Sequence, residues 1–157
     1  MAPDGSWGIE GRERYIYRHD DCHEHLQHSK NKILWVVCGE KDCDRLWAEG
    51  IAATTNPFGE GPGKWLDHYS EQLAEIGCEA AYITPDCDAT GDLHGPEVSA
   101  SLQSQGIKCK IVQLSLDEHG DVSDFLDLYS KEELISLARE TPEDSSAVNF
   151  PDLAVCP

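Results

Sequence analysis

The sequence predicts an α/β domain built on a mainly four-stranded parallel sheet with helices on both faces. Short apolar segments of strand length alternate along the chain with segments whose apolar residues recur every three or four positions. The first apolar segment, 33–38, contains no polar residue, which is typical of a strand buried on both faces of a parallel sheet. Alternating strands and helices with short connections place the helices on both faces of such a sheet.

The first half of the domain supplies two strands and two helices after residue 33. A helix is expected over 42–49, followed by a short strand over 51–55. The segment 56–64 contains three glycines and two prolines, so we expect a loop there. Residues 66–76 carry apolar side chains at helical spacing, and Gly77 is expected to end that helix.

The second half of the domain repeats this alternation. Strands are expected over 80–84 and 107–114, with the loop 85–91 and a helix to about residue 105 between them. The sequence Ser-Lys-Glu-Glu at 130–133 has the form of a capping box and predicts a further helix.

Three regions are expected along the chain: an N-terminal extension (1–32), the α/β domain (33–140) and a C-terminal tail (141–157). The extension contains a cluster of potential metal ligands: His19, Cys22, His23, His25 and His28. Imidazole and thiolate are the usual ligands of zinc, but the spacing of this cluster matches no zinc template. Metal binding and a charged, histidine-rich turn both remain open for it.

Composition limits the functional class. Thirty acidic residues against twelve basic ones give a net charge of −18, which repels a phosphate backbone unless cations intervene. The same acidity is compatible with an enzyme that collects Mg²⁺ with carboxylates. No apolar stretch approaches the roughly 18–20 residues of a membrane span, and no signal peptide is visible, so a soluble cytoplasmic protein without membrane partners is expected.

Acidic residues follow three of the predicted strands. In a parallel sheet the carboxyl ends of the strands share one edge, where ligands bind. The Asp86-x-Asp88 pair is the most informative, because residues two apart in an extended segment point the same way and both carboxylates can face one cation. Alone, such a pair also fits a solvated turn. The full set of acidic residues at the three strand ends includes Glu40, Asp42, Asp86, Asp88, Asp121 and Asp124.

These motifs resemble the Toprim family, and within it the helicase-associated DNA primases of phages and mobile elements. The resemblance covers roughly 33–127 and rests on motifs in the family's order and spacing. They are Val-Cys-Gly-Glu-Lys-Asp-Cys-Asp-Arg-Leu at 37–46, Ala-Thr-Thr-Asn at 53–56, Gly-Lys-Trp at 63–65, Pro-Asp-Cys-Asp-Ala-Thr-Gly at 85–91 with His94 after it, and Asp-Val-Ser-Asp-Phe-Leu at 121–126.

The resemblance implies Mg²⁺-dependent (or Mn²⁺-dependent) nucleotidyl or phosphoryl transfer on nucleic acid. It implies DNA and nucleotides as ligands, and a replicative helicase or another replication or defence protein as partner. The metal ligands would be Asp86, Asp88 and Asp121, supported by Asp42 and Asp124. The implied catalytic positions are Cys38, Glu40 and Lys64.

The position of Cys38 departs from the family, which carries its proposed general acid/base Glu there. A thiol is a softer ligand with different proton chemistry. A catalytically impaired binding or docking module and a Toprim nuclease are therefore alternative functions. We also hypothesise that Cys38 and Cys87, at neighbouring strand ends, form a redox-sensitive pair or a softer metal site; two unrelated thiols are the alternative.

The loop 56–64 fails the phosphate-loop template, because Phe58 stands where glycine is required and Trp65 replaces Ser or Thr. Its backbone amides and Lys64 remain candidate phosphate contacts, and a simple flexible connection is the alternative. Trp65 either stacks on a base or packs at the start of the following helix.

Overall fold

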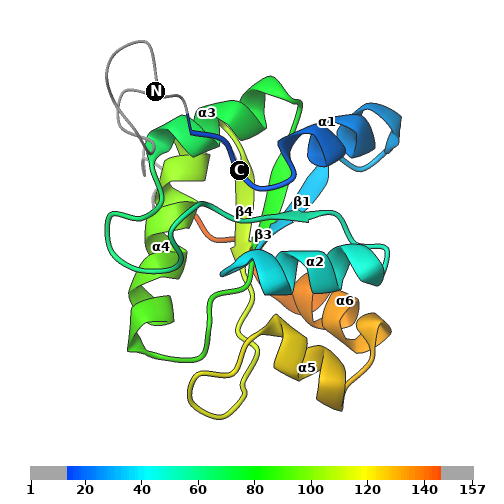
Figure 1. Ribbon diagram of the computed structural model, residues 1–157, viewed down its shortest axis with the longest axis vertical. Helices are drawn as coiled ribbons and strands as arrows, with labels where there is room; N and C mark the ends of the chain where they lie inside the picture. The colour runs from blue at the N-terminus through cyan, green and yellow to red at the C-terminus, as the bar shows by residue number, and fades with distance from the viewer. Residues whose placement is uncertain (1–13, 146–157) are drawn as a thin grey trace, which may run out of the picture.

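The computed structural model describes residues 14–145 and contains one parallel sheet of four strands (Figure 1). The strand order is β2-β1-β3-β4, and every neighbouring pair is parallel. This confirms the predicted α/β class. The strands are β1 (Ile33–Val36), β2 (Ala53–Thr54), β3 (Ala80–Ile83) and β4 (Lys108–Ile111).

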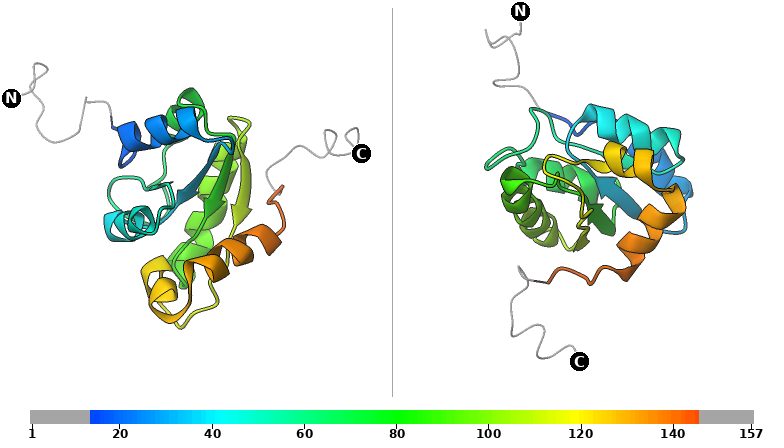
Figure 2. Two further views of the ribbon diagram at one scale, coloured as in Figure 1. Left: turned by 90° about the vertical axis from the view of Figure 1, so that its right-hand side faces the viewer. Right: turned by 90° about the horizontal axis from the view of Figure 1, so that it is seen from below.

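Helices cover both faces of the sheet. The right-hand view of Figure 2 shows α4 on one side of the strands and α2, α5 and α6 on the other. The buried side chains of α1, α3 and α4 belong to one core and those of α2, α5 and α6 to a second. The helices are α1 (His19–His28), α2 (Glu40–Ala48), α3 (Asp67–Glu75), α4 (Ala89–Gln103), α5 (Val122–Leu128) and α6 (Lys131–Glu140).

The segment around β1 shows why the apolar run at 33–38 has no polar positions. Leu34 and Val36 lie in the first core, whereas Trp35 and Val37 lie in the second. Successive side chains of a strand point to opposite faces, so a strand covered on both faces buries all of them.

The region before β1 packs into the first core from Ile16 onward, although the sequence sets 1–32 apart as an extension. Cys22 and Leu26 of α1 are fully buried in that core. The backbone N–H of Tyr17 donates to the carbonyl of Thr55, at 2.9 Å, beside the edge strand β2. The segment therefore covers an edge that would otherwise present unpaired backbone groups.

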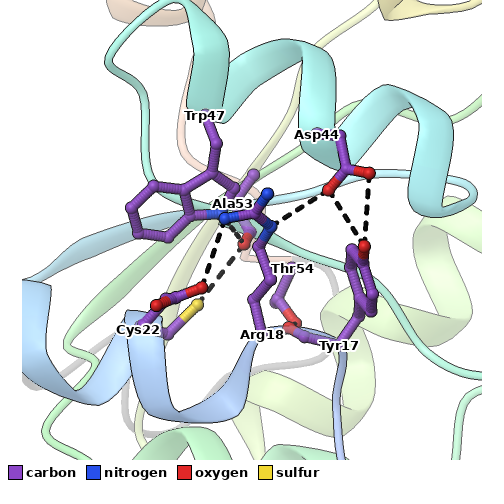
Figure 3. A network of polar contacts seen from close by, with 8 residues as sticks. Tyr17, Arg18, Cys22, Asp44, Trp47, Ala53 and Thr54 are labelled. Carbon is purple, nitrogen blue, oxygen red and sulfur yellow. Dashed lines mark hydrogen bonds and ion pairs between the residues drawn. The ribbon is translucent and has the colours of Figure 1, made fainter.

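A polar network fastens this segment to α2 (Figure 3). Asp44 accepts hydrogen bonds from the Tyr17 hydroxyl and from Nε of Arg18, each at 3.0 Å. Trp47 Nε1 and the Cys22 thiol both donate to the carbonyl of Ala53. Within residues 14–145 the histidines of α1 do not come together as a set of three potential metal ligands, and Cys22 is committed to the core.

The structure differs from the sequence expectations mainly at the strand ends and in α1 and α5. Each strand leaves the sheet one or more residues earlier than expected, and the residues that follow form the loops at its carboxyl edge. The ten-residue helix α1, where the sequence suggests a metal site or a charged turn, and the seven-residue helix α5 were not predicted. Of the predicted tail 141–157, Asp144 pairs with Cys109 of β4, and 146–157 lie outside the described residues. Within 14–145, no helix combines the length and apolar character needed to cross a membrane.

Candidate metal centre

The candidate site lies where the sheet changes direction. From β1 the chain passes to β2 on one side and then returns to β3 on the other side of β1. In open α/β sheets, ligands bind outside the carboxyl ends of the strands at such a switch point. Cys38 follows β1 and Asp86 follows β3, so both residues lie at this position.

Cys38, Glu60 and Asp86 meet there. One potential ligand atom from each lies within 4.8 Å of the other two. The Cys38 thiol donates to Glu60 Oε2 at 2.6 Å, and the backbone N–H of Asp86 donates to the same oxygen at 3.1 Å. All three residues are half-buried. Cys38 and Asp86 follow the ends of β1 and β3, and Glu60 lies in the loop that follows β2. The three groups therefore come from the ends of three adjacent strands.

Glu60 is held in place by the internal hydrogen bonds of its loop. The side-chain amide of Asn56 donates to three carbonyls of that loop, those of Pro57, Gly59 and Lys64. Two further contacts tie the loop to α4: Gly61 with His94 Nδ1 at 3.2 Å, and the Gly63 N–H with Glu97 Oε1 at 2.7 Å. The glycine-rich segment is thus an ordered loop that presents a carboxylate, rather than a simple flexible connection.

Asp86 is positioned by backbone contacts on both sides. The Cys87 N–H donates to the carbonyl of Gly120 at 2.8 Å, and the His119 N–H donates to the carbonyl of Cys87 at 2.9 Å. These bonds join the loops that follow β3 and β4. On the other side, Gly91 of α4 approaches so closely that a Cβ there would lie 2.0 Å from the Asp86 carbonyl oxygen. The Oδ1 atom of Asp86 is buried and has no hydrogen-bond partner among residues 14–145.

Burial and neighbouring carboxylates raise the pKa of Asp86 to about 8. Burial is the largest cause, and the charges of Glu60, Asp42, Asp121 and Asp88 add to it. Burial also raises the pKa of Asp42 to about 6, although the Ser123 hydroxyl donates to its Oδ1 at 2.6 Å. Four carboxylates, those of Glu60, Asp42, Asp121 and Asp88, therefore act on the charge of Asp86 at this edge of the sheet.

Three of the predicted metal ligands also cap helices. The Gly91 N–H donates to Asp88 Oδ1 at 2.7 Å and holds the pKa of Asp88 below its usual value. Asp121 and Asp124 form the capping box of α5, in which each side chain accepts the backbone N–H of the other. For Asp121, burial acts to raise the pKa, but the Asp124 N–H and the Lys41 amine, 3.1 Å away, outweigh it and lower the pKa.

Replacing Asp121 separates capping from metal binding. Asp121→Ala is expected to lower the free energy of unfolding by about 1–2 kcal/mol, because it removes an N-cap. Ser130→Ala, which breaks the equivalent capping box of α6 away from the acidic edge, is the matched control. If Asp121 also binds metal, only the Asp121 variant weakens Mg²⁺ binding in a calorimetric titration. Equal Mg²⁺ affinity in both variants would restrict Asp121 to capping.

Glu40, Lys64 and Trp65 do not join the cluster. Glu40 is the first residue of α2 and is exposed. Lys64 is also exposed, and no ion pair involves it within the described part of the chain. Trp65 is buried, with Nε1 donating to Ser70 Oγ at 2.8 Å, so of its two predicted roles the structure shows packing at the start of α3.

The structure contains no disulfide between Cys38 and Cys87. Both thiols are free, and Cys87 packs at the border of the second core, outside the three-residue cluster. The partner of Cys38 is instead Glu60, which sequence reasoning missed. The available signal was that Glu60 is the single acidic residue in 56–64, directly after the strand that neighbours β1.

Among known proteins, similarity appears at the level of structure. No protein-family model and no curated protein sequence matches the chain. The Aquifex aeolicus primase (zinc binding and RNA polymerase domains) superposes with a TM-score of 0.66 at 21% identity, over 80% of this chain and 29% of that one. The DnaG catalytic core gives a TM-score of 0.66 at 15% identity, over 82% and 40% of the two chains.

A DNA primase domain from Pseudomonas aeruginosa gives a TM-score of 0.61 at 14% identity, over 74% of this chain and 36% of that one. The chain thus spans 29% to 40% of the length of these structures. The similarity shows that the chain has a Toprim-like α/β fold, the fold found within these primase structures.

Proposed function

We propose that the chain is the Toprim domain of a DNA primase-like replication protein that supports Mg²⁺-dependent or Mn²⁺-dependent nucleotidyl or phosphoryl transfer on nucleic acid. The observation that carries this proposal is the position of Asp86 at the switch point of a primase-like fold, where burial and the surrounding carboxylates raise its pKa to about 8. A helicase or another replication or defence protein is the partner that the Toprim resemblance implies.

The residues at this edge fit a divalent cation. The buried, unpartnered Oδ1 of Asp86 is a free oxygen ligand, and Mg²⁺ needs only one or two carboxylates besides water and phosphate oxygens. Asp86 would be the central ligand, with Asp88, Asp121 and Asp42 close enough to act on its charge. A bound cation would neutralise the charge that develops on a transferring phosphoryl group.

The chain's own residues would position a phosphate-bearing substrate around that cation. Lys41 stands 73% exposed at the first turn of α2, and the Asp121 carboxylate holds its amine at 3.1 Å. Lys64, in the loop that follows β2, lies on the β2 side of the same edge. Because the net charge is −18, approach of a phosphate depends on these few cationic groups and on the metal.

The test is divalent-cation-dependent nucleotide binding, followed by primer synthesis on single-stranded DNA. We expect a ribonucleoside triphosphate to bind with Mg²⁺ or Mn²⁺ and not with EDTA, and the binding to be lost in Asp86→Asn. The Cys87→Ser variant is the control, since Cys87 lies between the two aspartates but outside the cluster. Nucleotide binding that is indifferent to cation and to Asp86 would contradict the proposal.

A catalytically impaired module that docks to a replication or defence complex is the second candidate, and Cys38 favours it. The Toprim resemblance places a Glu at that position, and here the thiol points to Glu60. Primer synthesis and DNA nicking, measured for the chain and for Cys38→Glu, separate the candidates. Activity that appears only in the Glu variant identifies a silenced enzyme, and nicking without synthesis identifies a nuclease. Synthesis by the unaltered chain excludes the docking module.

A further inference from the structure

We propose that Cys38, Glu60 and Asp86 form a site for a thiophilic divalent cation, which binds Zn²⁺ and Co²⁺ more tightly than Mg²⁺. The inference rests on the location of the proposed function and deepens it by naming the class of cation. The proposed function uses Asp86 with the surrounding aspartates; the site proposed here keeps Asp86 and adds Cys38 and Glu60 as ligands.

The spacing of the three ligand atoms suits such a cation. A tetrahedral zinc ion with bonds of about 2.0–2.3 Å keeps neighbouring ligand atoms about 3.5 Å apart. Here the three atoms lie within 4.8 Å of one another, and Cys38 Sγ lies 2.6 Å from Glu60 Oε2. Side-chain shifts of about 1 Å therefore suffice to surround an ion.

The mixture of ligands determines which ion is preferred. Thiolate is a soft ligand that selects zinc, copper(I) and similar ions, whereas carboxylates alone suit Mg²⁺ and Mn²⁺. One thiolate with two carboxylates gives three protein ligands. Catalytic zinc sites use three protein ligands and leave a fourth position for water or substrate, which here would be a phosphate oxygen.

Cation binding at this site exchanges protons for the metal. In the structure the Cys38 thiol donates to Glu60, and within residues 14–145 the Asp86 Oδ1 atom has no hydrogen-bond partner. Burial and the neighbouring carboxylates raise the pKa of the Cys38 thiol, so the metal must displace its proton. When the cation binds, the thiol proton leaves to solvent and a thiolate–metal bond replaces the S–H bond, and the proton that Asp86 retains below about pH 8 leaves as well. The cation then compensates the charges of Glu60 and Asp86, which otherwise repel each other.

The three ligands are held from different directions, so the site is largely formed before the ion arrives. Cys38 follows β1, Asp86 follows β3, and the tethered loop after β2 carries Glu60. All three residues are half-buried rather than fully enclosed. Preorganised ligands of this kind favour tight binding.

Histidines elsewhere in the chain can also bind these cations, so the experiment needs a signal that is specific for the thiolate. His19 and His23 lie one helical turn apart on α1, with ring centroids 6.4 Å apart, and His119 is 75% exposed beside Asp88. Each can bind Co²⁺ or Zn²⁺ weakly without Cys38. The thiolate-to-cobalt charge-transfer band in the near ultraviolet, in contrast, reports a cobalt–sulfur bond directly.

The experiment is a titration of the full chain with Co²⁺ under reducing conditions, followed by displacement with Zn²⁺ and then with Mg²⁺. We expect the charge-transfer band in the unaltered chain and in Cys87→Ser, and its loss in Cys38→Ser. In Glu60→Gln the band should persist, with Co²⁺ affinity weakened at least about tenfold. Zn²⁺ should abolish the band at stoichiometric concentration, whereas Mg²⁺ should not. Circular dichroism confirms that each variant is folded.

A band that survives in Cys38→Ser, or a folded chain with no band, overturns the inference. Equal displacement by Mg²⁺ and Zn²⁺ also overturns it, because the site would then lack thiophilic preference. The proposed function is judged separately, by cation-dependent nucleotide binding. If the chain binds nucleotide but shows no cobalt band, the proposed function stands and this site is excluded. If the band appears but nucleotide does not bind, the site stands and the proposed function is contradicted.

Discussion

Asp86→Asn is expected to stabilise the metal-free protein at pH 8 by about 2–4 kcal/mol, which raises the melting temperature by roughly 4–16 °C. Burial and the surrounding carboxylates raise the pKa of Asp86 to about 8, against 3.8 in the unfolded chain. Asparagine keeps the shape of the side chain and removes the charge that opposes folding. The measurement is thermal unfolding in EDTA at a series of pH values.

The direction of the pH dependence follows from proton binding. Between pH 4 and pH 8 the unfolded chain has lost the Asp86 proton while the folded chain retains it. Stability therefore falls as pH rises through this window, by up to about 1.4 kcal/mol per pH unit for this group. Asp42, with its pKa raised to about 6, acts in the same direction between pH 4 and 6. Below pH 4 the Asp86→Asn variant and the unaltered chain should converge.

Asp88→Asn is the matched control, two residues away in the same loop. The Gly91 N–H lowers the pKa of Asp88, so its charge stabilises the folded chain above its unfolded pKa, and that contribution is lost as pH falls through the folded pKa. The Asp88→Asn substitution should therefore leave stability at pH 8 unchanged or reduced. An Asp86→Asn variant that melts below the unaltered chain at pH 8 in EDTA would show that the carboxylate is not under electrostatic strain.

Gly91→Ala is expected to destabilise the chain by about 2–4 kcal/mol and to weaken divalent-cation binding. A Cβ at position 91 would lie 2.0 Å from the Asp86 carbonyl oxygen and 3.0 Å from its backbone N and C. Backbone cannot move aside as a flexible side chain can, so the loop carrying Asp86 must shift. This outweighs the gain of about 1 kcal/mol in helix propensity from replacing glycine with alanine. Thermal unfolding and metal titration both measure it.

Gly95→Ala is the control within the same helix. A Cβ there would meet side-chain atoms, with Pro85 Cγ at 3.2 Å and Ile111 Cγ2 at 3.4 Å, and these can yield by a few tenths of an ångström. We expect a smaller loss of stability and unchanged cation binding. If Gly91→Ala were no more harmful than Gly95→Ala, the close approach of α4 would not be what fixes Asp86.

The sheet and most helices were predictable because their apolar periodicity reflects burial. β1 is apolar throughout because two cores cover it, and Leu34 and Trp35 point into different ones. The segment 14–28 was not recognised as part of the core because few of its residues are apolar. Ile16, Cys22 and Leu26 make its buried contacts while histidines and acids occupy the rest of α1.

The candidate site was only partly predictable, because aspartate serves both as a metal ligand and as a helix cap. Asp121 and Asp124 were interpreted as metal ligands, and α5 was missed, yet the same pair is the capping box that starts this helix. Glu60 carried one sequence signal, as the single acidic residue in 56–64, but its exact position depends on three-dimensional tethers, such as Asn56 to Gly59 and Gly61 to His94. No local pattern encodes those contacts.

The proposed function requires the carboxyl edge of the sheet to bind a divalent cation through Asp86. Isothermal titration of Mg²⁺, Mn²⁺ and Zn²⁺ into the reduced chain and into Asp86→Asn measures this binding. We expect one tight saturable site in the unaltered chain, beside the weaker binding of Zn²⁺ by histidines, and the tight site is absent, or weakened at least about tenfold, in the folded Asp86→Asn variant. Equal binding by both proteins, or no binding of any of the three cations by the unaltered chain, would contradict it.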